Sequence, residues 1–223
     1  MRGVIFDLDG TLVDTEVVWN AALDDLLSSK YGQSFDLRTK PEMMGKPKEE
    51  AAAVFKRLYR LPTGVDDLIA ERLASYARMR EQMGVVQPMP GADALVRALH
   101  AAGVPLGVAT SENRPRTEDT LRRLGWDALF SAVTVSDEVL RGKPAPDIYA
   151  EAARRLGCGA RECVAVEDAP AGVESARAAG LKVIGVRDAR WGVDLSAADL
   201  VVPSLTDLTV DRLRALVVTG NHP

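Results

Sequence analysis

The sequence contains few of the residues on which covalent cross-links, zinc sites and histidine catalysis depend. Its 223 residues include 2 cysteines and 2 histidines, and 5% are aromatic. Cys158 and Cys163 have no histidine near them, so neither a disulfide framework nor a zinc site is predicted, and both are expected to be reduced packing residues. His100 and His222 lie away from every predicted strand end, which leaves a histidine-dependent mechanism without support.

The chain also lacks long hydrophobic runs and an excess of basic charge. No stretch approaches the ~18 apolar residues of a membrane helix, and Asp7 comes too early for the apolar region of a signal peptide. The 28 basic and 32 acidic residues give a net charge of −4, which offers little attraction to nucleic acid or an anionic membrane. We therefore expect a cytoplasmic protein with a small-molecule partner and no nucleic-acid or membrane partner. A monomer is expected because no separate apolar stripe is visible.

Short apolar runs rich in β-branched residues indicate five buried strands. They span residues 3–7, 104–110, 132–135, 163–167 and 182–186. Helical patterns lie between them, each with proline in the first turn and glycine directly after the end, at residues 115–124, 146–156 and 170–179. Strands that alternate with helices predict a parallel sheet with helices on both faces, so the fold class is α/β.

The segment after the first strand departs from this pattern and is predicted to be a helical insert. It has no convincing strand, and apolar residues recur at helical spacing in three groups. The groups are Val18, Ala22, Leu23 and Leu26; Ala51, Val54, Phe55 and Leu58; and Leu68, Leu73 and Met79. Thr63 lies three residues before Asp66 and is expected to cap the third helix. The chain thus divides into a core of residues 1–13 and 88–223 and a helical domain of residues 14–87.

The polar residues most suited to chemistry follow the predicted strands. In an open parallel sheet, ligands bind beyond the carboxyl ends of the strands. The residues expected at this edge are Asp7, Asp9, Thr110, Ser111, Lys143, Glu167 and Asp168. Four carboxylates against one ammonium would repel a phosphate and resist folding unless a cation were bound. Because all the candidate ligands are oxygens, Mg²⁺ is the predicted metal.

The pattern Asp7-Leu-Asp-Gly-Thr11 at the end of an apolar strand resembles the signature of the haloacid dehalogenase-like hydrolase superfamily. Thr110, then Lys143 in Gly-Lys-Pro-Ala-Pro-Asp, and then Glu167-Asp168 follow in the order of that family. The helical insert is similar to the small α-helical cap of the branch that contains phosphatases and β-phosphoglucomutase. The resemblance covers nearly the whole chain and implies a Rossmann-like core with an inserted α-helical cap domain.

The resemblance also implies roles for the core residues. Asp7 would be the nucleophile that forms an aspartyl-phosphate, and Asp9 would protonate the leaving oxygen and later accept a proton from water. The catalytic and phosphate-binding groups beside them would be Gly10, Thr110, Ser111 and Lys143. Mg²⁺ would be held by Asp7, the Asp9 backbone carbonyl and Asp168, with Glu167 as a further ligand or a hydrogen-bonding neighbour.

The cap offers candidates for recognising the rest of a substrate. Met44-Gly-Lys-Pro-Lys48 is similar to the substrate loop of such caps, and Lys48 is included in the predicted site. Arg72 is a second candidate cation, although a solvated helix surface is the simpler interpretation. Trp19 is expected to pack in the core of the cap, with a place over the substrate pocket as the alternative.

The preferred function is a Mg²⁺-dependent phosphatase that acts on a small phosphorylated metabolite, such as a sugar phosphate, a nucleotide-like compound or phosphoglycolate. A β-phosphoglucomutase-like mutase is the rival enzyme. Those mutases have histidine at the position of Trp19, arginine at that of Lys48 and usually an aliphatic residue at that of Thr11, so all three departures favour the phosphatase. A non-catalytic phosphate-binding protein is the alternative from another class, and the filled catalytic positions argue against it. The segment 167–173 is similar to the pseudouridine-5′-phosphatase group.

Overall fold

The computed structural model describes residues 1–44, 46, 48–84, 87–190 and 192–218. The chain forms two compact units. The first, here called the core unit, comprises Met1–Asp14, Gln87–Ala189 and Val193–Pro223, and the second, the cap unit, comprises Thr15–Val86 with Arg190–Gly192. The boundaries after Asp14 and before Gln87 each lie one residue from the positions expected from the sequence, whereas the placement of Arg190–Gly192 with the cap unit differs from that expectation.

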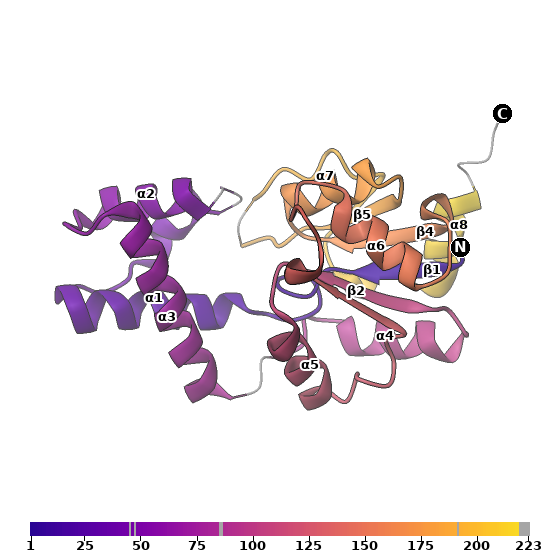
Figure 1. Ribbon diagram of the computed structural model, residues 1–223, viewed down its shortest axis with the longest axis horizontal. Helices are drawn as coiled ribbons and strands as arrows, with labels where there is room; N and C mark the ends of the chain where they lie inside the picture. Colours follow the sequence, from indigo (N-terminus) through magenta and orange to yellow (C-terminus); the bar gives the residue numbers. More distant parts are fainter. Residues whose placement is uncertain (45, 47, 85–86, 191, 219–223) are drawn as a thin grey trace. The chain divides into compact units, whose positions relative to one another are not determined.

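The core unit is built on a six-stranded sheet in which every paired strand is parallel, with the order β3-β2-β1-β4-β5-β6 (Figure 1). The strands are β1 (Gly3–Phe6), β2 (Leu106–Thr110), β3 (Ala132–Val135), β4 (Cys163–Glu167), β5 (Lys182–Val186) and β6 (Leu200–Val202). The prediction of an α/β, Rossmann-like parallel sheet is confirmed. The sixth strand was not predicted, because its three residues are too few to show a pattern.

The central position of β1 brings three strand ends together. Phe6 is paired with Val108 of β2 on one side and with Val166 of β4 on the other. Val4, Ile5 and Phe6 are fully buried, as expected for a parallel strand covered on both faces. The residues that follow these three strands therefore meet at one edge of the sheet.

Five helices accompany the sheet. They are α4 (Ala92–Ala101), α5 (Arg114–Arg123), α6 (Asp147–Arg155), α7 (Pro170–Ala178) and α8 (Val210–Val218). α6 and α7 pack on one face through a cluster that includes Ile5 and Val173 (Figure 1). The Asn113 side chain accepts a hydrogen bond from the Arg116 N–H, so Asn113 is the N-cap residue that precedes α5. The predicted ends of α5, α6 and α7 differ from the observed ones by at most one residue.

The cap unit consists of α1 (Glu16–Tyr31), the short 3₁₀ helix η1 (Leu37–Glu42), α2 (Lys48–Tyr59) and α3 (Val65–Met83). Its core contains most of the apolar residues predicted to be buried. The fully or nearly buried ones are Val18, Ala22, Leu23, Leu26, Ala51, Phe55 and Leu68.

Two expectations about the third cap helix are wrong. Leu73 was expected on the buried face of the helix but is 51% exposed. At about 100° per residue it lies roughly 140° around the helix from the buried Leu68, whereas the buried Tyr76 lies at a smaller angle from Leu68. Thr63 does not cap the helix, which begins after Gly64. The Thr63 hydroxyl instead forms a hydrogen bond with the Tyr31 hydroxyl at 2.7 Å.

The two chain segments that lead into and out of the insert are fastened to each other within the core unit. Val13 forms a bridge with Pro88, and the Asp14 N–H donates to the Gln87 carbonyl at 2.9 Å. The Met89 N–H donates to the Leu12 carbonyl at 2.8 Å. The insert thus starts and ends at one place, a few residues after Asp7.

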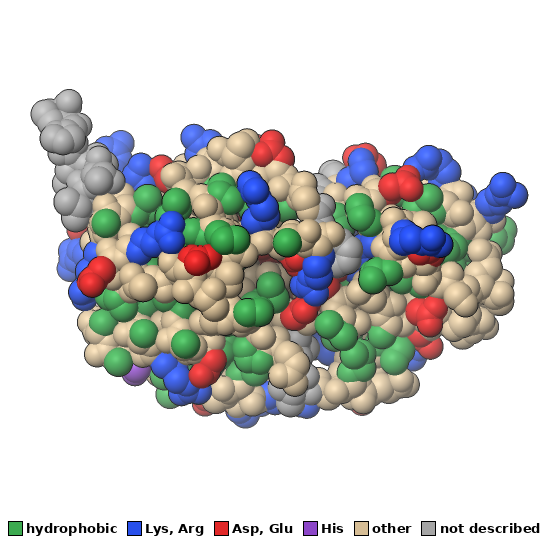
Figure 2. Space-filling model, turned by 180° about the vertical axis from the view of Figure 1, so that it is seen from behind, with side chains coloured by type: hydrophobic (Ala, Val, Ile, Leu, Met, Phe, Trp, Pro, Cys, Tyr) green, Lys and Arg blue, Asp and Glu red, His purple; other side chains and the backbone are tan. Residues whose placement is uncertain are grey.

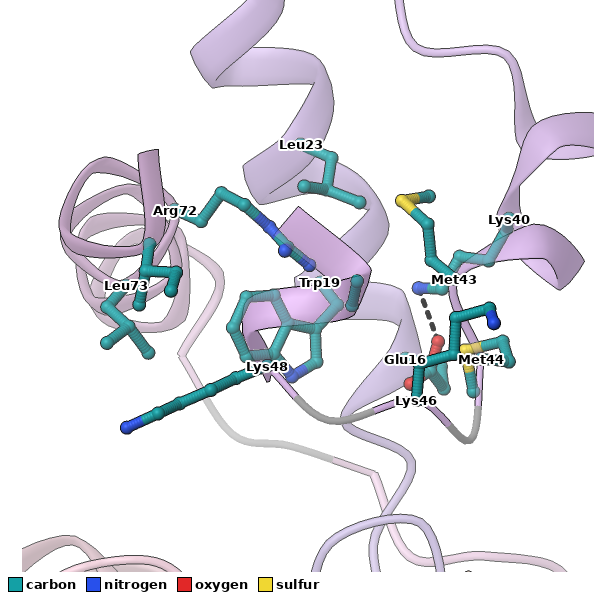
Figure 3. A pocket seen from close by; sticks show the side chains of 12 residues that line it. Glu16, Trp19, Leu23, Lys40, Met43, Met44, Lys46, Lys48, Arg72 and Leu73 are labelled. Carbon is teal, nitrogen blue, oxygen red and sulfur yellow. Dashed lines mark ion pairs between the residues drawn. The ribbon is translucent and has the colours of Figure 1, made fainter. Parts of the chain in front are cut away.

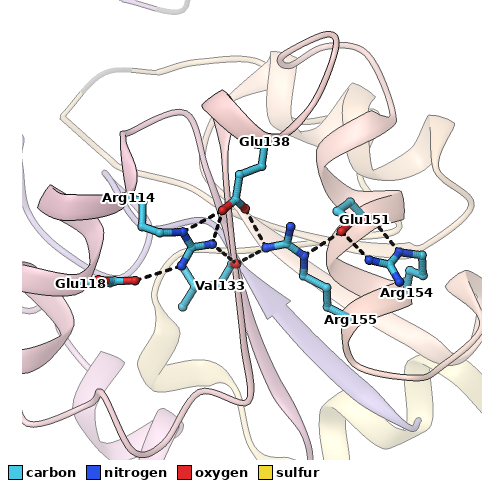
Figure 4. Close-up of polar contacts among 7 residues, drawn as sticks. All are labelled: Arg114, Glu118, Val133, Glu138, Glu151, Arg154 and Arg155. Atoms are coloured by element: carbon cyan, nitrogen blue, oxygen red, sulfur yellow. Dashed lines mark hydrogen bonds and ion pairs between the residues drawn. The ribbon is translucent and has the colours of Figure 1, made fainter.

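The edge strand β3 is covered by charged side chains. The Val133 carbonyl accepts from Arg114 Nη2 at 2.9 Å and from Arg155 Nη1 at 2.7 Å, and both arginines also bind the Glu138 carboxylate (Figure 4). An exposed strand edge invites pairing with other chains, and such charges oppose it.

The surface carries no large area of one charge sign on the face drawn in Figure 2, where basic and acidic side chains alternate with scattered apolar ones. None of the helices in the described part of the chain combines the length and apolar character needed to cross a bilayer. His222 lies outside the described residues.

Candidate active site

The loop after β1 turns sharply around Gly10. Its φ of +93° lies in the region that favours glycine, and a Cβ there would lie 2.4 Å from Asp168 Oδ2. The close approach of the Asp168 carboxylate is a second reason for glycine at this position.

Asp7 stands at the centre of the cluster and is 6% exposed. Its Oδ1 accepts from Lys143 Nζ at 2.6 Å. Its Oδ2 is buried and accepts no hydrogen bond from the described residues. Burial raises the pKa of Asp7 to about 7, with Lys143 opposing the rise and Glu167 and Asp9 adding to it. A buried carboxylate oxygen that accepts no hydrogen bond from the described residues is suited to binding a cation.

Lys143 is held between two carboxylates. Its Nζ donates to Asp7 Oδ1 and to Glu167 Oε1, each at 2.6 Å, and the side chain is 9% exposed. Burial alone would lower the pKa of the lysine, but Asp7 and Glu167 outweigh burial and raise it. The ammonium is therefore charged throughout the physiological range.

Glu167 accepts four hydrogen bonds. Oε1 accepts from Lys143 and from the Tyr149 hydroxyl at 2.8 Å, while Oε2 accepts from the backbone N–H groups of Asp168 (3.1 Å) and Ala169 (3.2 Å). Gly172 makes room for this carboxylate, because a Cβ there would lie 1.8 Å from Oε1. Both oxygens are thus committed to protein donors.

Asp168 is fixed by a residue of the β1 loop. The buried Thr11 hydroxyl donates to Asp168 Oδ1 at 2.8 Å. Burial, together with the negative charges of Asp7 and Glu167, raises the pKa of Asp168 well above its usual range. Burial is the largest cause of the raised pKa of both Asp7 and Asp168, and the neighbouring carboxylates add to it.

Asp9 and Thr110 also meet at this edge. The Thr110 hydroxyl donates to Asp9 Oδ2 at 3.3 Å and accepts from the Glu112 N–H at 3.1 Å. Ser111, the next residue, is exposed. All the core residues proposed from the sequence therefore gather beyond the ends of β1, β2 and β4 or in the loop before α6.

The residues present fit a divalent cation. Asp7, Glu167 and Asp168 each have a carboxylate oxygen within 4.8 Å of the others, and of the three carboxylates only that of Glu167 already has four protein donors among the described residues. The donors are all oxygens, which suits Mg²⁺ better than a transition metal. The bare Oδ2 of Asp7 and the raised pKa of Asp168 indicate the same need for positive charge.

A family model for haloacid dehalogenase-like hydrolases matches residues 4–186. The chain belongs to this family. Among its relatives, it is 38% identical over 211 residues to a bifunctional riboflavin kinase/FMN phosphatase of Arabidopsis thaliana, covering 94% of this chain and 55% of that protein. It is 35% identical over 217 residues to a probable pseudouridine-5′-phosphatase of Drosophila melanogaster, covering 93% and 91%.

A solved structure shares the whole architecture. CbbY from Rhodobacter sphaeroides in complex with phosphate aligns with a TM-score of 0.76 and 26% identity, over 96% of this chain and 99% of that one. The predicted family is confirmed, as is the predicted enzyme class, a phosphoric monoester hydrolase of the haloacid dehalogenase-like type. The chain spans about half the length of the Arabidopsis relative.

Three residues that shape the site, Thr11, Tyr149 and Gly172, were not predicted from the sequence. Thr11 and Tyr149 donate hydrogen bonds to Asp168 and Glu167, two of the carboxylates predicted to lie at the site, and Gly172 leaves space for Glu167. Thr11 is part of the quoted motif, so the sequence alone could have indicated that it lies at the site. Tyr149 has no comparable signal, because one tyrosine on the apolar face of a helix is more simply a core residue.

The candidate residues of the cap line a cavity of about 320 Å³ within the cap unit (Figure 3). Lys48 lies at its margin with a 75% exposed side chain. Trp19 is half-buried and stacks on Tyr76 with ring centroids 4.2 Å apart, so it both packs in the cap and faces the cavity. Gly45 and Pro47 of the predicted substrate loop lie outside the described residues.

Proposed function

We propose that the protein is a Mg²⁺-dependent phosphatase that hydrolyses the phosphate monoester of a small metabolite through an aspartyl-phosphate on Asp7. The observation that carries the proposal is the state of Asp7. One of its oxygens is bound by Lys143 at 2.6 Å, and the other is buried and bare among carboxylates. Such a carboxylate suits attack on phosphorus once positive charge offsets its neighbours.

Asp7 and Asp168 would hold the metal, together with the Asp9 backbone carbonyl that the family resemblance implies. When bound, Mg²⁺ would neutralise charge on the phosphoryl oxygens and keep Asp7 ionised. We assign Glu167 to Lys143 rather than to the metal, because four protein donors already occupy its oxygens. Of the two roles that the sequence left open for Glu167, we therefore propose that of a hydrogen-bonding neighbour.

The first step would transfer the phosphoryl group to the protein. A carboxylate oxygen of Asp7 forms a bond to phosphorus as the bond from phosphorus to the ester oxygen breaks, and protonated Asp9 gives its proton to that leaving oxygen. Lys143, Thr110 and the Ser111 amide bind the remaining oxygens. Glu167 keeps the Lys143 ammonium in place.

The second step would release phosphate. Water attacks phosphorus as the bond between phosphorus and Asp7 breaks, and Asp9 takes the proton of that water. Asp7 leaves as a carboxylate, so the protein returns to its starting state and the products are an alcohol and inorganic phosphate. The 3.3 Å hydrogen bond from Thr110 to Asp9 Oδ2 places the Asp9 carboxylate next to Thr110. Because the Thr110 hydroxyl has one hydrogen, it would turn from Asp9 to a phosphoryl oxygen when an ester binds.

Hydrolysis is favoured over mutase activity by the cap residues. Trp19 lines the cap cavity where the mutases of the sequence comparison have histidine, and it carries no group that could exchange a proton with a sugar hydroxyl. The relatives named above as FMN and pseudouridine-5′ phosphatases support small phosphorylated metabolites as substrates. A cytoplasmic location and a monomeric state remain predictions.

The test is phosphate release from a panel of esters, with Mg²⁺ and with a chelator. The panel comprises pseudouridine 5′-phosphate, FMN, fructose 1-phosphate, glycerol 3-phosphate, 3-phosphoglycerate, phosphoglycolate and β-glucose 1-phosphate. Release that stops with the chelator and returns with Mg²⁺ is expected. Formation of glucose 6-phosphate from β-glucose 1-phosphate without release of phosphate would support the mutase instead.

A further inference from the structure

The two cysteines of the chain lie together at the amino ends of the strands, away from the carboxylate cluster. Cys163 is the first residue of β4 and is fully buried, and Cys158 follows α6 and is half-buried. Cys163 pairs with Gly3, the first residue of β1. At about 3.3 Å per residue, Asp7 lies roughly 13 Å along the chain from Gly3. Chemistry at the two thiols is therefore separate from chemistry at Asp7.

The space beside Gly3 shows that the two sulfurs are neighbours. A Cβ built on Gly3 would lie 3.2 Å from Cys158 Sγ and 3.5 Å from Cys163 Sγ. Both sulfurs thus face the same small region next to the Gly3 backbone, and any side chain at this position would have to displace them. A glycine at the start of β1 leaves this region to the two thiols.

The chain between the cysteines is a short, well-bonded turn. It contains the 3₁₀ helix η3 (Ala160–Glu162). The Glu162 N–H donates to the Gly159 carbonyl at 2.9 Å, and the Glu162 carboxylate accepts from the Gly159 N–H at 3.0 Å. The Cys158 thiol donates to the Ala153 carbonyl of α6 at 3.8 Å. Because the turn is short and its polar groups are paired, the folded chain holds the two sulfurs close together.

The two thiols differ in their access to solutes. Cys163 is fully buried, and burial raises the pKa of its thiol, with the neighbouring Cys158 adding to the rise. The Cys163 thiol therefore stays protonated at neutral pH. Cys158 is partly exposed, so it is the thiol that a small oxidant can reach. An accessible thiol beside a second thiol is the arrangement in which oxidation ends in a disulfide.

We propose that Cys158 and Cys163 form a site of reversible oxidation, at which a peroxide converts the two thiols into a disulfide that ties the end of α6 to the start of β4. The Cys158 sulfur, as a thiolate, attacks a peroxide oxygen. An S–O bond forms as the O–O bond breaks, and the hydroxide released takes up the Cys158 proton to become water.

The second step joins the two sulfurs. The Cys163 sulfur attacks the Cys158 sulfur, the S–S bond forms as the S–O bond breaks, and the leaving hydroxide takes the Cys163 proton to become a second water. The sulfurs together lose two electrons, which reduce hydrogen peroxide to water. A dithiol reductant restores both thiols by exchange with the disulfide.

The competing explanation is that both cysteines serve only as packing residues. Cys163 belongs to the apolar cluster that includes Ile5 and Val173, and Cys158 packs against that cluster. Packing alone predicts that peroxide leaves both thiols free, or oxidises Cys158 without any bond to Cys163. Neither explanation depends on the proposed phosphatase function, because neither involves Asp7.

The test treats the wild-type protein with hydrogen peroxide, removes the peroxide with catalase, unfolds the chain in iodoacetamide and measures its mass. The chain has 2 cysteines, so every thiol label can be assigned. The expected product is two hydrogens lighter than the starting protein, takes up no label and migrates as a monomer without reductant. After treatment with dithiothreitol it takes up two labels.

The two steps are separated by single variants. Cys163→Ala should stop at a sulfenic acid on Cys158, which dimedone traps. Cys158→Ala is the matched control, and its buried Cys163 should stay unoxidised and take up one label after unfolding. If either variant does not fold, the wild-type masses decide. The proposal is overturned if treated wild-type protein takes up two labels, gains oxygen on Cys158 while Cys163 is still labelled, or forms a disulfide only between two chains.

Thermal unfolding tests whether the disulfide suits the folded chain. A cross-link restricts the unfolded chain, so oxidised wild-type protein should have a Tm about 2–6 °C above that of the reduced protein, and dithiothreitol should reverse the increase. A Tm that is equal or lower would show that the bond strains the fold, and it would contradict a tie between α6 and β4 in the folded protein.

Discussion

Single residues position the charged groups of the site through close contacts. Glu167 fills the space beside Gly172 so closely that a Cβ would lie 1.8 Å from Oε1. Lys143 and Tyr149 bind that same oxygen. The placement of the Lys143 ammonium on Asp7 therefore depends on a glycine that touches neither residue.

Gly172→Ala tests this dependence. Gly172 is inside α7, where alanine normally stabilises a helix by about 1 kcal/mol relative to glycine. We expect the opposite here, a loss of about 1–3 kcal/mol in the free energy of unfolding and at least about a hundredfold fall in kcat, because Glu167 must move and release Lys143.

Gly142→Ala is the matched control for this substitution. Gly142 precedes Lys143 in the chain, but a Cβ there meets nothing within 4 Å. Its stability should change by less than about 0.5 kcal/mol. Denaturant unfolding and steady-state kinetics measure both variants, and a stabilised, fully active Gly172→Ala would contradict the arrangement described for Glu167.

At the scale of elements, the edge strand β3 depends on side chains from two helices. Arg114 of α5 and Arg155 of α6 both donate to the Val133 carbonyl and both pair with Glu138, which is 26% exposed. When one arginine is removed, the other still donates to the Val133 carbonyl and still pairs with Glu138. Removal of both leaves the carbonyl and the carboxylate without these partners.

We predict that the two arginines are coupled. Arg114→Ala and Arg155→Ala should each lower the free energy of unfolding by about 0.5–1 kcal/mol, and the double variant should lose more than the two values combined. Arg123→Ala, which breaks an exposed pair with Asp119, is the control and should act additively with either. A double-mutant cycle in urea measures the coupling, and strict additivity of Arg114 and Arg155 would contradict it.

The elements differ in how well the sequence predicts them. β1, β4 and β5 are runs of buried apolar residues, and α5 and α7 carry proline in the first turn, so local signals suffice. β6 has three residues, and Leu73 fits an apolar pattern yet is 51% exposed. Whether such a residue is buried or such a strand forms depends on which elements pack against it. The local sequence pattern does not contain this information.

The candidate site is likewise only partly predictable from the sequence. Motif spacing placed Asp7, Asp9, Lys143 and Asp168 together, because the ends of parallel strands share one edge. The spacing could not show that Glu167 is saturated by donors, since the Tyr149 hydroxyl and the space beside Gly172 come from α6 and α7. Nor could it show that Arg72 lies between two rings.

For the whole molecule, the carboxylate cluster links folding to pH and metal. The pKa of Asp7 is raised to about 7 in the folded protein by burial, so the folded state binds this proton more tightly than the unfolded chain. Without metal, the contribution of Asp7 to stability is fully present below pH ~4 and is lost as the pH rises to about 7. Mg²⁺ requires the ionised carboxylate, so its stabilising effect should grow over the same range.

Thermal unfolding in chelator and in Mg²⁺ between pH 4 and pH 8 measures this linkage. The increase in Tm on adding Mg²⁺ should be small near pH 5 and largest near pH 8. Asp7→Asn cannot ionise at this position, so it should be more stable than wild type in chelator at pH 8 and gain less from Mg²⁺. A Mg²⁺ effect that is equal at all pH values, or equal in the two proteins, would contradict the assignment of Asp7 to the metal.

The most direct test of the central claim is the detection of a phosphoryl group on Asp7 during turnover. The wild-type protein is mixed with Mg²⁺ and an ester that it hydrolyses, quenched in acid within the first turnovers, and analysed by peptide mass spectrometry. We predict one added phosphoryl group on the peptide that contains Asp7, its absence in chelator, and loss of turnover in a folded Asp7→Asn variant. Hydrolysis at an undiminished rate by Asp7→Asn, with no phosphorylated Asp7 in the wild type, would contradict the account.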